Sequence, residues 1–104
     1  MNSVRYQVSV GRDAPVFRGH FPDYPILPGV MLLSFAREAL APVYGEQRRI
    51  RRILRQRFLR PVCPGSTVLV ECRVGDADTD GYRVACRWSL PDGTLLSRGE
   101  FIYL

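Results

Sequence analysis

One histidine and one helix start can support acid–base chemistry in this chain. His20 is the only histidine, and it lies in the segment Gly19-His20-Phe21-Pro22-Asp23-Tyr24-Pro25-Ile26-Leu27-Pro28-Gly29-Val30. A neutral imidazole titrates near physiological pH and can take a proton from a substrate. Pro28 suits the first turn of a helix, where free N–H groups on Gly29 and Val30 can stabilise developing negative charge. The segment is a plausible place for a general base beside an anion-binding helix end.

The residues after Gly29 predict a helix. Its apolar residues surround nearly the whole helix, so we expect it to be buried rather than to lie on a surface; they are Met31, Leu32, Leu33, Phe35, Ala36, Ala39 and Leu40. Pro42 is expected to end or kink the helix, because it removes a hydrogen bond to the Glu38 carbonyl. Gly45 is a suitable stop.

Alternating apolar residues predict strands on both sides of this helix. Before it we expect a strand at Ser3–Val10, and after it a hairpin and a closing strand; these are Thr67–Val74, Tyr82–Leu90 and Leu95–Leu104. If Val74 faces Val84 in the hairpin, Cys72 lies opposite Cys86. The arginine-rich segment 47–60 has no clear period, and we favour a strand with a bulge over a short helix. One helix beside antiparallel strands predicts an α+β layout in a single domain, residues 1–104.

Composition excludes several classes of protein. No apolar run is long enough for a membrane span, and the N-terminus lacks the apolar region of a signal peptide. Cys63, Cys72 and Cys86 have no metal-ligand spacing, so we expect buried free thiols in a reducing cytoplasm and neither metal nor cofactor. The net charge of +5 favours an acidic partner.

Two motifs resemble the signatures of one family. The segment Gly19-His20-Phe21-Pro22-x-x-Pro25-x-x-Pro28-Gly29-Val30 is similar to the signature loop of the β-hydroxyacyl-acyl-carrier-protein dehydratases, and Arg57-Phe58-Leu59-Arg60-Pro61-Val62-x-Pro64-Gly65 resembles their second signature. The resemblance implies the hot-dog fold, an antiparallel sheet wrapped around one long central helix. It also implies a homodimer or higher even oligomer, with interface tunnels that admit an acyl-phosphopantetheine chain.

The resemblance implies dehydration of 3-hydroxyacyl thioesters, on acyl carrier protein or coenzyme A, in fatty-acid, polyketide or polyene-type lipid synthesis. His20 is then the base, and the Gly29 and Val30 amides polarise the thioester. A lone histidine is more often a hydrogen-bonded structural residue, but the surrounding motif reverses that preference. The implied substrate-binding residues also include Phe21, Pro28, Met31 and Phe35, although Met31 and Phe35 are equally explained as core.

The chain departs from the family at the catalytic carboxylate, which is expected six residues after Pro28. Ser34 occupies that position, and a hydroxyl is no general acid near neutral pH, although it can hold a water. Glu38 lies one turn further along the same face. Either it replaces the missing acid, with its pKa raised by burial, or it pairs with an arginine, such as Arg37 or one from a partner subunit. A thioesterase of the same fold therefore stays an alternative. So does a non-catalytic subunit that binds an acyl chain or forms a heterodimer with a related hot-dog subunit.

The arginine-rich segment 47–60 has two interpretations. Most charge runs are solvated faces, but a basic rim would also steer an acidic carrier protein to the tunnel. We assign carrier binding to Arg55, Arg57 and Arg60. Nucleic acid is not expected as a partner, because no recognition helix or aromatic RNA-binding motif accompanies the arginines.

Overall fold

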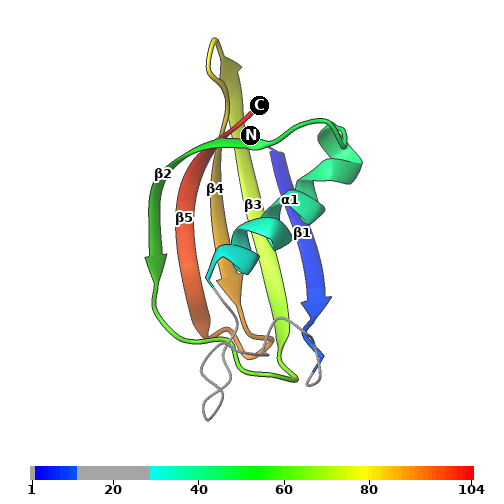
Figure 1. Cartoon of the computed structure of the whole chain (residues 1–104), viewed down its shortest axis with the longest axis vertical. Coiled ribbons are helices and arrows are strands. Elements are labelled where there is room, and N and C mark those ends of the chain that lie inside the picture. The colour runs from blue at the N-terminus through cyan, green and yellow to red at the C-terminus, as the bar shows by residue number, and fades with distance from the viewer. Residues whose placement is uncertain (1, 12–28) are drawn as a thin grey trace.

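The computed structural model describes residues 2–11 and 29–104. In them, five antiparallel strands form one sheet in the order β1-β3-β4-β5-β2, and one helix crosses one face of it (Figure 1). The elements are β1 (Asn2–Ser9), α1 (Val30–Tyr44), β2 (Ile50–Phe58), β3 (Thr67–Asp78), β4 (Gly81–Ser89) and β5 (Leu95–Tyr103). The predicted order of one strand, one helix and four strands is confirmed. So is the α+β layout.

The core lies between α1 and the inner face of the sheet. Side chains alternate along β3 and β4, so that every second residue points toward the helix and is buried. Val74 pairs with Val84 and Cys72 with Cys86, as the hairpin pattern predicts. Trp88 is fully buried in the same layer, and its indole N–H donates to the Leu32 carbonyl at 2.6 Å. This bond ties the first turn of α1 to the sheet.

Helix α1 differs from expectation at its end and in its burial. It continues through Pro42 to Tyr44, and Gly45 follows with a φ of 113° and an N–H that donates to the Ala41 carbonyl at 2.8 Å. Pro42 is exposed, so water can reach the Glu38 carbonyl that it leaves without a backbone donor. The helix is not buried all round either: Val30 is 65% exposed. A single sheet covers only one side of a helix, so the opposite side faces solvent.

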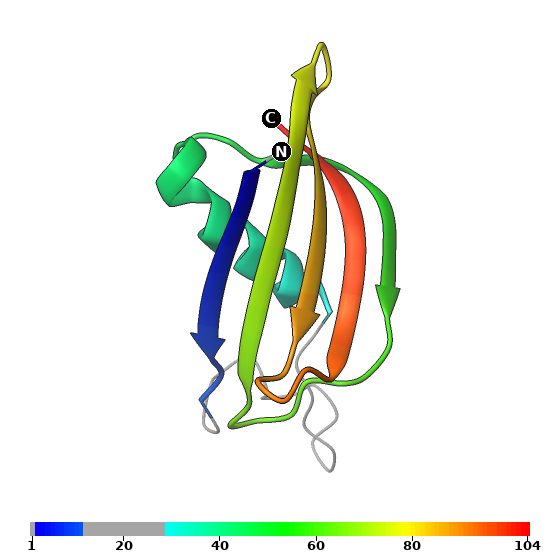
Figure 2. The same cartoon turned by 180° about the vertical axis from the view of Figure 1, so that it is seen from behind.

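Strand β2 is the predicted strand with a bulge. Its pairing with β5 shifts register between Ile50 and Arg52 and again between Ile53 and Arg55. It is an edge strand, and α1 runs over β3 and β1 rather than over it (Figure 1; Figure 2 shows the sheet from behind). The inward side chains from β3 to β5 are buried, whereas Ile53 and Phe58 on edge strand β2 are about half exposed.

The three cysteines are free, but they are not all buried as expected. Cys72 and Cys86 lie in the core, and Cys63 is exposed in the connection between β2 and β3. Cys63 stands between Val62 and Pro64 outside any strand, where the period-2 rule for inward side chains does not apply.

Candidate functional site

The start of α1 forms the first part of the candidate site. Gly29 is the N-cap residue, with φ −56° and ψ −32°, and the first turn carries no acidic side chain. The Leu32 N–H donates back to the Gly29 carbonyl at 3.0 Å. A glycine cap offers no side-chain oxygen to the other N–H groups of the first turn. The helix end is therefore suited to an anionic or partly negative ligand atom.

Phe58, the last residue of β2, lies against this helix end. A Cβ added to Gly29 would come within 2.6 Å of Phe58 Cε1, which is closer than carbon atoms approach. The crowding comes from the neighbouring ring and not from an unusual φ, so a larger residue at this position requires the ring to move. Phe58 is itself 55% exposed, so its ring covers one side of the helix start and leaves its own outer face open.

An apolar hollow of about 360 Å³ adjoins these two residues. Among the described residues, Arg60 is the one charged side chain of the lining, which is formed by Gly29, Leu32, Phe58, Leu59, Arg60, Pro61 and Val62. A hollow of this composition can hold a flexible, mostly apolar chain, and the guanidinium can pair with an anionic group on it. A larger hollow of about 710 Å³ lies among arginines of β2, β4 and β5, but Gly29 and the other helix-start residues do not line it.

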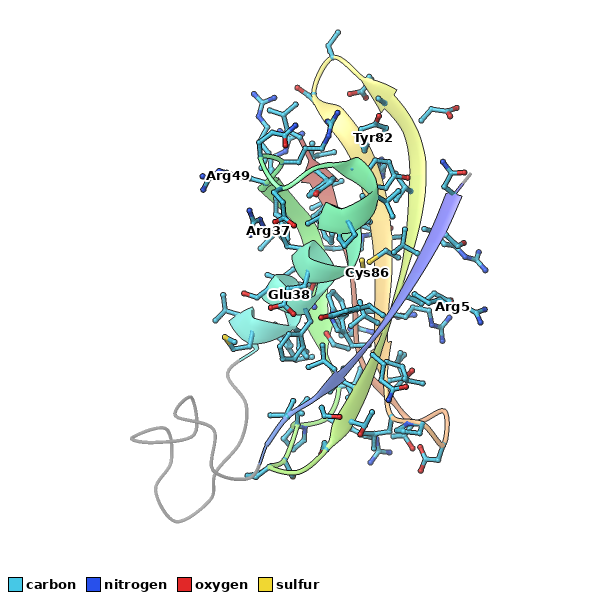
Figure 3. All side chains as sticks on the ribbon, turned by 90° about the vertical axis from the view of Figure 1, so that its right-hand side faces the viewer. Arg5, Arg37, Glu38, Arg49, Tyr82 and Cys86 are labelled. Atoms are coloured by element: carbon cyan, nitrogen blue, oxygen red, sulfur yellow. The ribbon has the colours of Figure 1, made fainter. Side chains whose placement is uncertain are left out.

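Ser34 and Glu38 share the exposed side of α1, one turn apart, as their spacing predicts. Glu38 points away from the sheet (Figure 3). The neighbouring Arg37 does not pair with it: its Nη2 donates to the Glu46 carbonyl at 2.9 Å and its Nε to the Arg48 carbonyl at 3.3 Å. The two candidate acid positions thus face outward, where the other described residues do not cover them.

Met31 and Phe35 have different surroundings. Phe35 is 7% exposed and belongs to the core cluster between α1 and the sheet. Met31 is partly buried and packs against the edge of that cluster. Phe35 therefore has the burial of a core residue, whereas Met31 retains a surface that a ligand can reach. His20, Phe21 and Pro28 lie outside the described residues, and their predicted roles stay predictions.

The comparison with known families identifies the chain. The family model described as ApeI-like, ApeI dehydratase, matches residues 1–97. The chain belongs to the ApeI-like dehydratase family. The chain is also 31% identical over 99 residues to the 3-hydroxyacyl-[acyl-carrier-protein] dehydratase FabZ of Polynucleobacter asymbioticus, which covers 88% of this chain and 66% of that protein. It spans just under two thirds of the length of that relative.

Solved structures agree on the architecture of this ApeI-like chain. A chain of the dehydratase heterocomplex ApeI:P from Xenorhabdus doucetiae matches with a TM-score of 0.75 and 24% identity, over 97% of this chain and 86% of that one. A 1,4-dihydroxy-2-naphthoyl-CoA thioesterase from Synechocystis matches with a TM-score of 0.74 and 14% identity, over 99% and 82%. At these identities the likeness shows the fold alone, and the expected hot-dog fold is confirmed.

The structure separates the three arginines that the sequence groups as a carrier-binding rim. Arg60 lines the hollow at the helix start. Arg55 and Arg57 alternate with inward residues of β2 and point to the other face of the sheet. There Arg55 Nε lies 3.9 Å from Glu100 Oε1, and Arg57 stands opposite Arg98.

Several contacts that hold the site together are not readable from the ApeI-like sequence. Gln56 Nε2 donates to Ser97 Oγ at 2.7 Å, and Ser97 Oγ donates to the Arg57 carbonyl at 2.7 Å. These bonds fix the end of β2 on β5 and so position Phe58. Gln56 is an uncharged polar residue at an inward position of an arginine-rich strand, and this is the one sequence signal for these bonds.

Other chemistry is absent from the described part of the chain or is inert there. Residues 2–11 and 29–104 contain no group of three side chains placed to hold a metal ion. The contact with Cys72, at 2.7 Å between the sulfur atoms, and burial both raise the pKa of the Cys86 thiol far above its ordinary value. A thiol that stays protonated is a poor nucleophile. Among the described residues, no helix is long and apolar enough to span a membrane.

Proposed function

We propose that this chain takes part in the dehydration of 3-hydroxyacyl thioesters carried by an acyl carrier protein, which yields trans-2-enoyl thioesters. The observation that carries the proposal is the match of residues 1–97 to the ApeI-like dehydratase model. The Polynucleobacter relative, whose name states this reaction, supports it. The motifs around His20 and Phe58 are further support.

The proposed reaction begins with proton removal at C2 of the substrate. The His20 imidazole takes this proton, and the electron pair of the C2–H bond moves toward the thioester carbonyl. The N–H groups of Gly29 and Val30 donate hydrogen bonds to the carbonyl oxygen as negative charge develops on it. The pair then forms the C2=C3 double bond while the C3–O bond breaks.

The departing hydroxyl needs a proton so that it can leave as water. Glu38, or a water held by Ser34, supplies it in the proposed mechanism. Both side chains face outward on α1, so a second subunit must cover them to exclude bulk solvent from the reaction. Loss of a general acid lowers a rate by about 10²–10⁴-fold, and a chain with serine at the carboxylate position is expected to be slow unless Glu38 compensates.

The hollow beside the helix start is the proposed route for the substrate arm. Leu32, Phe58 and Val62 give it an apolar wall, and Arg60 places a positive charge at its rim. A phosphopantetheine arm combines a mostly uncharged chain with a phosphodiester, which such a wall and charge would accommodate. Arg60 is therefore the leading candidate for the carrier side of the site. Arg55 and Arg57 are secondary candidates, because they point to the other face of the sheet.

A second candidate function is that of a partner subunit that completes another chain's active site. It is favoured by Ser34, which leaves this chain without the family carboxylate, and by the likeness to a chain of the ApeI:P heterocomplex. In that case this chain contributes residues to a shared active site, and the catalytic acid of that site comes from a related subunit. Thioester hydrolysis, an activity named for one structural neighbour, is distinguished by the same assay.

The test is a direct assay of the purified chain with 3-hydroxyacyl and saturated acyl thioesters on an acyl carrier protein. Enoyl product from the first substrate is expected, and His20→Ala is expected to lower its rate by about 10²–10⁴-fold. Ser34→Glu should raise the rate strongly if the natural chain lacks a working acid. Ser3→Glu, which adds the same charge on exposed β1, is the matched control and should leave the rate unchanged.

Glu38→Gln and Glu46→Gln form a second matched pair, because both glutamates are exposed and only Glu38 lies beside Ser34. A loss confined to Glu38→Gln assigns the acid to Glu38.

Unchanged turnover in His20→Ala contradicts the mechanism. Free thiol released from the saturated substrate indicates hydrolysis instead. No turnover alone, with activity restored by a related subunit that carries the helix carboxylate, indicates the second candidate function.

A further inference from the structure

The outer face of the sheet, turned away from α1, carries the larger hollow of about 710 Å³ (Figure 2 views this face). Its lining comes from three strands: residues 54–57 of β2, 85–87 of β4 and 98–100 of β5. Four of these residues are arginines, and Glu100 is the one acidic residue among them. The Glu100 carboxylate is already bound by Arg83, whose Nη2 lies 2.8 Å from Glu100 Oε2. The hollow therefore has a surplus of positive charge.

Three of the arginines stand side by side across this face. Arg57 of β2 is opposite Arg98 of β5, and Arg98 is opposite Arg87 of β4. Because neighbouring strands lie about 4.8 Å apart, the row spans about 10 Å. Like charges directly opposite each other destabilise a sheet. A local arrangement that lowers stability in this way is typical of a functional site.

The carboxylate nearest to the row in the sheet register is engaged elsewhere. Glu71 of β3 stands opposite Arg87, but its Oε2 lies 3.1 Å from Nε of Arg5 on the far side. Among the residues that the structure describes, no carboxylate forms an ion pair with Arg57, Arg87 or Arg98. These guanidinium groups are therefore available to an external anion.

The arrangement is suited to linked phosphate groups. A guanidinium donates two parallel hydrogen bonds to one phosphate, and Arg is the residue best matched to that geometry. A single phosphate cannot neutralise three arginines in a row, so the ligand needs more than one. The volume lies in the range of small-molecule sites, about 300–1,000 Å³. A nucleic-acid strand fits less well, because the described lining has no aromatic ring on which a base could stack.

We propose that this hollow binds a small anion with two or three linked phosphate groups, held by Arg57, Arg87 and Arg98. The site does not rest on the proposed function, because Gly29 and the other helix-start residues do not line it. An inorganic polyphosphate and the phosphate chain of a nucleotide share this chemistry, and the experiment separates them.

The experiment is calorimetric titration of the purified chain at about 50 mM salt with inorganic triphosphate, ATP and inorganic monophosphate. Triphosphate is expected to form a saturable 1:1 complex, at least about tenfold tighter than that of monophosphate, because it makes more charge-assisted hydrogen bonds. Tighter binding of ATP than of triphosphate identifies a nucleotide, and equal or weaker binding identifies an inorganic chain. Raising the salt to about 500 mM should weaken both complexes.

Paired variants locate the bound anion. Arg87→Gln/Arg98→Gln should weaken triphosphate binding by at least about tenfold. The matched control Arg49→Gln/Arg73→Gln makes the same charge change at exposed positions outside the hollow, and it should change binding less than about twofold. Arg60→Gln, at the helix-start hollow, should likewise have little effect. Circular dichroism and thermal unfolding verify that each variant is folded.

Glu100→Gln gives a change of the opposite sign. It removes the one carboxylate of the described lining and frees Arg83, so triphosphate should bind about two- to fivefold more tightly. A misfolded variant cannot produce this gain.

Four results would overturn the proposal: equal binding of monophosphate and triphosphate, an equal loss in the control pair, a loss in Arg60→Gln, or no gain in Glu100→Gln. A glutamate peptide or a thymidine oligonucleotide that binds more tightly than triphosphate, and does so through Arg87 and Arg98, would assign this face to a macromolecule instead. None of these measurements uses a thioester substrate, so failure of the proposed function is a separate result.

Discussion

β1 and β2 are both edge strands of one sheet, and they differ in what lies against them. On β1, Val4 and Val8 are partly buried and pack against the core, and α1 runs over the strand (Figure 1). Arg5 on its outer face is paired with Glu71 at 3.1 Å. On β2, Ile53 and Phe58 are about half exposed. The helix covers the apolar residues of one edge, and those of the other edge stay about half exposed.

This difference separates the part of the molecule that holds the fold from the part that completes the site. The covered half, which includes the inward side chains of β5, contains the buried core with Trp88 and the hairpin pair Cys72 and Cys86. The open half contains Phe58, Arg60 and the start of α1, which are the described parts of the candidate site. Substitutions should therefore affect stability in the covered half, and assembly or activity in the open half.

The largest difference in the free energy of unfolding is expected between the variants Trp88→Ala and Phe58→Ala. Trp88 is fully buried and its indole donates to Leu32, so its loss should lower the free energy of unfolding by about 3–5 kcal/mol. Phe58 is mostly exposed in the single chain, and its loss should cost less than about 1 kcal/mol. Urea unfolding of the isolated chains measures both values.

If Phe58→Ala lowers the free energy of unfolding nearly as much as Trp88→Ala, then Phe58 is already well packed in the isolated chain. Trp88→Phe serves as the control, since it keeps an aromatic ring and removes only the N–H. Its cost should fall between the two, because the Leu32 carbonyl loses a buried donor.

The fold was largely predictable because its signals are local. Period-2 alternation located β3, β4 and β5, and one register assumption, Val74 facing Val84, placed Cys72 beside Cys86. The arginine-rich segment was recognised as a bulged strand although its period is unclear. The predictions that were wrong concern tertiary packing. An apolar helix looked buried all round, because sequence does not say that only one sheet covers it.

The candidate site was predictable only where motifs were available. The Ser34–Glu38 spacing is a local feature and is seen. The helix start differs from expectation, because α1 begins at Val30 with Gly29 as its N-cap and not at Pro28. The Phe58 ring against Gly29 joins residues almost thirty positions apart, and no helical or strand period encodes such a contact. The sequence groups Arg55, Arg57 and Arg60 as one predicted carrier-binding surface. In the structure, Arg55 and Arg57 point to the outer face of the sheet, and Arg60, beyond the end of β2, lines the hollow.

An intermediate effect on stability is expected from alanine substitutions at two glycines where an added Cβ would be equally crowded. A Cβ at Gly81 would lie 2.6 Å from the Tyr103 carbonyl oxygen, and one at Gly29 would lie 2.6 Å from the Phe58 ring. Gly81 also has a φ of 127°, so Gly81→Ala should cost about 1–3 kcal/mol. Gly29→Ala should cost less than about 1 kcal/mol, because an exposed ring can turn aside and a backbone carbonyl cannot.

Thermal and urea unfolding of the two alanine variants give the comparison. Gly29→Ala should still reduce turnover, since the displaced ring enters the hollow beside the helix start. An equal loss of stability in both variants would mean that Phe58 is held as firmly as the backbone of β5, and the open half would then be more rigid than its exposure indicates.

The smallest effects are expected from single arginines on the two edges, and they should have opposite signs. Arg5→Ala removes an exposed ion pair with Glu71, so it should lower the free energy of unfolding by roughly 0.2–1 kcal/mol at low salt. Arg57→Ala removes a charge that stands opposite Arg98, so it should leave stability unchanged or raise it slightly. Urea unfolding at low and high salt measures both, and high salt should abolish both effects. If Arg57→Ala destabilises the isolated chain as Arg5→Ala does, Arg57 already has an acidic partner within the chain and is not available to an external anion.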